Sequence, residues 1–100
     1  MIDPRYNKAL SIFQEFGPRR GLPVRQRWQE AFPKVTPHVM YEWESQFTEL
    51  ERFALDLATK VWNQALDANI AIQLIAERFP MLNKDRLGAT YSQAMYFAIK

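Results

Sequence analysis

The sequence predicts an all-α protein: a single bundle of five helices around one long central helix at about residues 37–67, with two corners where a helix ends in Phe-Pro and a turn leads into the next helix. Apolar residues recur at alternating steps of three and four along most of the chain, whereas no segment alternates with the period of two typical of a β-strand. With 48% apolar residues, 24% charged residues and three glycines, the composition suits one helical domain spanning residues 1–100.

The first two helices are predicted on either side of a glycine- and proline-rich loop at residues 17–23. Asp3 can cap the first helix and Pro4 can be its first residue, because proline lacks the N–H that is unpaired there. The second helix is expected to begin at Pro23 and to end before Pro33. The residues predicted to face inward are Tyr6, Ala9, Leu10, Phe13 and Phe16 in the first helix and Val24, Trp28, Ala31 and Phe32 in the second.

The long central helix has the clearest periodicity in the chain. Thr36 is a suitable N-cap and Pro37 a suitable first residue. One apolar stripe follows along the helix, here called the central stripe: Met40, Trp43, Phe47, Leu50, Ala54, Leu57 and Val61. From Phe53 onward more apolar residues flank the stripe, which predicts that this half of the helix is covered on most sides and that Trp62 is buried.

The last two helices are predicted after a break at residues 66–69, where poor helix formers accompany two possible caps, Asp67 and Asn69. A continuous helix reaching Phe79 is the alternative. Pro80 ends the fourth helix, and Asn83 can cap the fifth. The predicted inward residues are Ala71, Ile72, Ile75 and Phe79, with Ile70 and Leu74 beside them, and then Leu87, Tyr91, Ala94, Met95 and Ala98.

The two Phe-Pro corners belong to a weak internal repeat. Shifting the chain by 47 positions aligns Gln26, Glu30, Phe32, Pro33, Ser45 and Gln46 with Gln73, Glu77, Phe79, Pro80, Ser92 and Gln93. In each corner an aromatic residue closes a helix, an aliphatic residue folds back as a staple, and a capping residue starts the next helix. Two corners of similar geometry are therefore predicted, by common origin or by convergent turn chemistry.

Enzymatic chemistry is not predicted, and neither is a cofactor or a metal site. Cysteine is absent and His38 is the single histidine, which excludes Cys-based zinc or redox sites and multi-histidine centres. Glu42 lies four residues after His38, but two possible ligands do not make a site. No apolar run approaches the ~20 residues of a membrane span. The first residues lack the apolar core of a secretory signal, so we expect a cytoplasmic location.

The charge is unevenly distributed although its net value is only +2. Residues 1–40 contain seven Lys or Arg and three acidic residues. Residues 41–70 contain two Lys or Arg and six acidic residues, and residues 71–100 contain four Lys or Arg and two acidic residues. Basic flanks beside an acidic central helix predict ion pairs within the protein.

A non-enzymatic protein-interaction domain, either an adaptor or a homodimer, is the predicted function. The central stripe keeps its spacing for just over three heptads, a length at which helices pair. We expect the first half of the central helix to project beyond the bundle and to bind a protein partner or a second copy. The predicted partner-binding residues are Met40, Trp43, Phe47 and Leu50.

The alternative is a helix-turn-helix nucleic-acid-binding protein, because a helical corner and a basic strip are its minimum requirements. The fifth helix would then enter a groove of the nucleic acid. Glutamates on the central helix oppose this alternative, since phosphates repel them. The residues predicted for it are Arg19, Arg20, Arg25, Arg27, Lys84 and Arg86.

Overall fold

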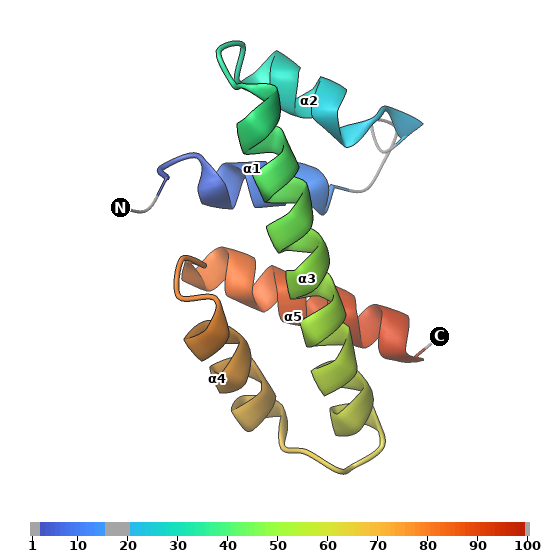
Figure 1. The fold of residues 1–100 in the computed structure, drawn as a ribbon. Coiled ribbons are helices and arrows are strands. Elements are labelled where there is room, and N and C mark those ends of the chain that lie inside the picture. The colour runs from blue at the N-terminus through green and yellow to red at the C-terminus, as the bar shows by residue number, and fades with distance from the viewer. Residues whose placement is uncertain (1–2, 16–20, 100) are drawn as a thin grey trace. The chain divides into compact units, whose positions relative to one another are not determined.

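The computed structural model describes residues 3–15 and 21–99, in which the secondary structure consists of helices α1 to α5 without a strand (Figure 1). The predicted all-α fold with a long central helix is confirmed. The chain divides into two compact units, Met1–Phe47 and Thr48–Lys100, and the long helix runs from the first into the second. The prediction of a single domain stays a prediction.

The first unit combines α1 (Tyr6–Phe13), α2 (Val24–Ala31) and the N-terminal part of α3 (Pro37–Trp62). Figure 1 shows α1, in blue, crossing behind α3. Aromatic rings from all three helices form its core. The indole of Trp28 lies 5.2 Å from that of Trp43 and 6.0 Å from the ring of Phe47, measured between centroids.

The start of α1 differs from the prediction. Asp3 and Pro4 precede the helix, which begins at Tyr6. The Asp3 carboxylate accepts a hydrogen bond from the Arg5 backbone N–H at 2.9 Å and pairs with the Arg5 guanidinium at 3.0 Å. A carboxylate held by arginine in this way stabilises a turn before the helix. The side-chain hydrogen bond from Arg5 is also the main reason why the pKa of Asp3 is lowered.

The end of α3 also differs, because the helix stops at Trp62 and not near residue 67. Gln64 adopts φ +62°, the left-handed conformation. Its N–H donates to the Val61 carbonyl at 3.0 Å, and the Ala65 N–H donates to the Lys60 carbonyl at 2.8 Å. These two bonds form a Schellman motif, which usually has glycine at the left-handed position. The sequence does not predict the end of the helix at this point, because the left-handed position is occupied by Gln64 and not by glycine.

Replacing Gln64 with glycine is expected to stabilise the protein by up to about 1 kcal/mol, because glycine adopts the left-handed conformation without steric cost. Urea unfolding followed by circular dichroism would measure the change. Thr59→Gly, on an exposed site inside the same helix, is the control and should destabilise by roughly 0.3–0.5 kcal/mol, because glycine forms helix less well than threonine. Destabilisation by both glycines would contradict the role assigned to Gln64.

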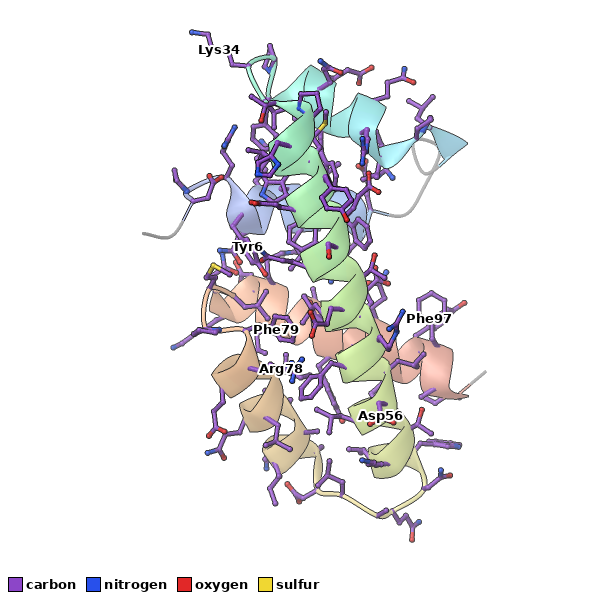
Figure 2. The ribbon with its side chains drawn as sticks, viewed as in Figure 1. Tyr6, Lys34, Asp56, Arg78, Phe79 and Phe97 are labelled. Carbon is purple, nitrogen blue, oxygen red and sulfur yellow. The ribbon has the colours of Figure 1, made fainter. Side chains whose placement is uncertain are left out.

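The second unit contains the rest of α3 with α4 (Ala68–Arg78) and α5 (Lys84–Ile99). The predicted break before α4 is confirmed. Asp67 caps α4, since its carboxylate accepts hydrogen bonds from the N–H groups of Asn69 and Ile70 at 2.8 and 3.4 Å. Figure 2 shows Arg78 and Phe79 between α3 and α4, where the Phe53 ring lies 6.0 Å from Phe79 and 5.0 Å from the Arg78 guanidinium carbon.

The two corners have closely similar geometry, as predicted. Phe32 adopts φ −131° and ψ 78°, and Phe79 adopts φ −124° and ψ 69°. The Val35 N–H donates to the Phe32 carbonyl at 2.9 Å, and the Leu82 N–H donates to the Phe79 carbonyl at 3.1 Å. Side chains cap both following helices: the Thr36 hydroxyl accepts from the Val39 N–H at 3.3 Å, and the Asn83 side-chain oxygen accepts from the Arg86 N–H at 2.8 Å.

Burial agrees with the predicted inward faces at many positions but not at all of them. Tyr6, Trp28 and Ile75 are buried as expected. Trp62, predicted to be buried, is 54% exposed, because the helix ends there and the turn that follows does not cover it. Ala31 is exposed, and Thr90, which was not predicted to face inward, is buried. Phe16 and the loop residues 16–20 lie outside the described residues.

Candidate interaction surface

The four residues predicted to bind a partner are part of the protein's own core. Phe47 and Leu50 are fully buried, and Met40 and Trp43 are only 4% and 3% exposed. The prediction that the first half of the central helix projects from the bundle is therefore wrong, because α1 and α2 both pack on it. These side chains reach no partner while the helices stay packed.

Phe47 is the residue around which the first unit packs. Its ring lies 5.1 Å from Tyr6, 5.6 Å from Phe13 and 6.0 Å from Trp28. The Trp28 indole N–H donates to the Ala9 carbonyl at 2.9 Å, which ties α2 to α1. The Tyr6 hydroxyl is buried and has no hydrogen-bond partner among the described residues, and burial raises its pKa. The stripe on α3 is thus a core stripe with aromatic partners from both neighbouring helices.

Arg25 and Arg27, both predicted for nucleic-acid binding, are engaged within the first unit. The Arg25 guanidinium pairs with Glu44 on α3. Arg27 is 6% exposed, so its prediction as a surface residue is wrong. Its guanidinium donates to the main-chain carbonyls of Leu22, at 3.2 Å, and of Ile12. The Glu15 carboxylate lies 3.6 Å away.

The other four residues predicted for nucleic-acid binding are not among the described residues of the first unit. Arg19 and Arg20 lie outside the described residues. Lys84 is exposed and Arg86 is half-buried at the start of α5, in the other unit. The Asn83 side chain already accepts a hydrogen bond from the Arg86 N–H, one of the backbone groups that would meet a phosphate.

Charges on the flanking helices pair with acids on α3, as the charge distribution predicted. Arg25 of α2 pairs with Glu44, and Arg78 of α4 pairs with Glu49. Within α3, Lys60 lies 3.5 Å from Asp56. These pairs are partly exposed, so each contributes no more than about 1 kcal/mol to stability. The acidic surface of α3 is therefore partly neutralised by its own neighbours.

His38 and Glu42, the pair considered as possible metal ligands, face each other across one turn of α3. The His38 Nε2 lies 3.1 Å from a Glu42 carboxylate oxygen, and both side chains are exposed. Among the described residues no group of three or more His, Cys, Asp or Glu side chains could hold a metal ion. The pair is an ordinary contact across one turn of a helix.

Large apolar side chains are exposed mainly on the second unit. Within residues 3–15 and 21–99, eight such side chains are at least about one-third exposed, and only Leu22 and Tyr41 belong to the first unit. The other six are Leu55, Trp62, Ile70, Tyr96, Phe97 and Ile99. Groups of exposed large apolar side chains are typical of sites where proteins bind one another. Sequence periodicity missed this surface because it assigned several of these residues to a covered helix.

The C-terminal half of α5 carries three of the six residues. Tyr96 is 50% exposed and Ile99 is 53% exposed, and the Tyr96 and Phe97 rings lie 5.5 Å apart. In Figure 2, Phe97 lies on the opposite side of α3 from Arg78 and Phe79. Phe97 follows Thr90 and Ala94 along the inward face of α5, but unlike them it is 41% exposed. The aromatic end of α5 therefore extends past the residues that cover the rest of that face.

No protein-family model, curated protein or solved structure matches the chain. None of the helices, over the residues that the structure describes, combines the length and the apolar character that crossing a bilayer requires.

Proposed function

We propose that this protein is a non-enzymatic protein-interaction domain that binds another protein chain through the exposed apolar side chains of its second unit. One observation supports the proposal: six of the eight large exposed apolar side chains among the described residues belong to that unit, and three of them are aromatic. Tryptophan and tyrosine are the residues that most often anchor protein interfaces. The partner-binding site predicted on the central stripe is thereby moved to α5 and the end of α3.

The side chains proposed as anchors have features that separate them from core residues. Trp62 and Tyr96 each leave about half of their surface exposed. A buried aromatic side chain removes about 150–250 Å² from water, so covering the exposed halves of both would contribute substantially to binding. Nucleic-acid binding has no comparable support, since Arg25 is paired and Arg27 is buried.

Site-specific photo-cross-linking would test the proposal. The photoreactive residue p-benzoylphenylalanine would replace Tyr96 in one variant and Tyr41 in another, which is the matched control because Tyr41 is 64% exposed on the first unit. Each variant would be irradiated as purified protein and in extract of the source cells. We expect a discrete adduct from position 96 and none from position 41.

The mass of the adduct would identify the kind of partner. An adduct of twice the chain mass in purified protein indicates a second copy, and a different adduct formed only in extract indicates another protein. Both results support the proposed function. Equal and diffuse labelling from the two positions would contradict it.

A further inference from the structure

The outer face of α5 carries no charge after its first turn. From Leu87 to Ile99 there is no Asp, Glu, Lys or Arg, although the side of the helix opposite Thr90 and Ala94 is exposed. The exposed charges of α5, Lys84 and Asp85, are confined to its first turn. An uncharged face on a surface helix is a face that another element can cover without removing a charge from water.

The exposed side chains on this outer face are small in the N-terminal half of α5 and bulky in the C-terminal half. Gly88 and Ser92 are exposed in the N-terminal half, and a Cβ added at Gly88 would meet no atom within 4 Å. Tyr96 and Ile99 are exposed in the C-terminal half. The spacing of four, four and three residues keeps these positions on one side of the helix.

Two copies of such a face are complementary when the helices run antiparallel. Pairing about a two-fold axis near residues 93 and 94 places Gly88 of one copy opposite Ile99 of the other, and Ser92 opposite Met95 and Tyr96. Small residues facing large ones allow helices to interdigitate closely. A parallel pair would instead place Gly88 against Gly88 and Ile99 against Ile99, leaving a gap at one end and a clash at the other.

We infer that the partner of this surface is a second copy of the chain, bound through antiparallel α5 helices in a two-fold dimer. The inference rests on the proposed interaction function and specifies its partner. Electrostatics do not oppose the pairing, because residues 48–100 contain six acids and six Lys or Arg and therefore have no net charge to repel a second copy. Antiparallel helices also bring opposite ends of their dipoles together.

The dimer is expected to be weak. Tyr96 and Ile99, the two bulky residues of the outer face, each expose about half of their surface, together roughly 200 Å², against the ~800 Å² that each partner contributes to a standard interface. A contact of this size is typical of dissociation constants in the micromolar range or above. Sedimentation equilibrium should therefore be run from about 1 μM to 1 mM, where such a dimer forms and dissociates.

Swapping the small and bulky residues tests the antiparallel register. Gly88→Leu and Ile99→Ala are each expected to raise the dissociation constant by about tenfold, and the double variant, which restores one small and one large residue at each contact, to return within about threefold of the wild type. Gly88→Leu should also raise the melting temperature measured at low concentration, because leucine forms helix better than glycine. Weaker association in a more stable protein cannot be caused by unfolding.

Tyr41→Ala is the matched control and should leave the dissociation constant unchanged, since Tyr41 is exposed on the first unit. A wild type that stays monomeric up to 1 mM, or a double variant no better than Gly88→Leu alone, overturns the inference. The proposed function is judged separately: a monomeric wild type that forms an extract-dependent adduct at position 96 is an interaction domain with a different partner. A monomer without that adduct contradicts both.

Discussion

Replacing Trp43 and Phe47 together with glutamate is expected to unfold the first unit rather than to separate two copies of the chain. Both side chains are buried, and Phe47 contacts aromatic rings from α1 and α2. Truncating one buried aromatic residue costs about 3–5 kcal/mol. Burying an unpaired carboxylate adds several more, so the total approaches the ~5–15 kcal/mol that stabilises a whole domain. Circular dichroism should show a loss of helix at 25 °C.

Tyr41→Glu is the control for that experiment, because Tyr41 lies on the same helix and is exposed. Its helix content and its unfolding midpoint should match the wild type. If the Trp43 and Phe47 double variant kept its full helix content and changed only its association state, the central stripe would be an interface and the burial described above would not be the state in solution.

Replacing Arg27 with methionine is expected to destabilise the protein by about 3–6 kcal/mol, because it removes two hydrogen bonds from a charged donor that contribute about 1.5–3 kcal/mol each. The substitution removes the donors to the Ile12 and Leu22 carbonyls and leaves Glu15 without its cation. Methionine keeps most of the aliphatic packing, so the effect isolates the guanidinium. Urea denaturation followed by tryptophan fluorescence would measure it.

Arg25→Met provides the comparison, since Arg25 lies on the same helix but its ion pair with Glu44 is partly exposed. The cost there should stay below about 1 kcal/mol. The two arginines are thus predicted to differ although they stand two residues apart. Equal small effects would mean that Arg27 is solvated and available to a ligand, as a nucleic-acid-binding role requires.

The helices themselves follow from local chemistry that the sequence displays. The spacing of Met40, Trp43, Phe47 and Leu50 identifies the buried side of α3, and the Phe-Pro steps at residues 32–33 and 79–80 identify both corners. Periodicity shows which face of a helix is apolar. It does not show what covers that face, and the same stripe is compatible with a core or with a dimer interface.

The parts that the sequence did not predict depend on main-chain groups or on tertiary packing. Arg27 is buried because two carbonyls from other segments accept its hydrogen bonds, and backbone acceptors carry no residue signature. The helix end at Trp62 depends on a left-handed glutamine where glycine would have been expected. The candidate surface on α5 could have been recognised in the sequence, because no charged residue occurs from Leu87 to Ile99. Apolar periodicity did not identify it, since periodicity locates the inward face of a helix and not the outer one.

The three tryptophans divide between the units in a way that makes each unit spectroscopically distinct. Trp28 and Trp43 are enclosed in the first unit, whereas Trp62 is 54% exposed in the second. Emission at short wavelength that resists acrylamide quenching should therefore originate from the N-terminal half of the chain, and quenchable emission at longer wavelength from the C-terminal half. A denaturant titration read at two emission wavelengths would then report on the two halves independently, without a label, and would reveal whether they lose their structure together or in sequence.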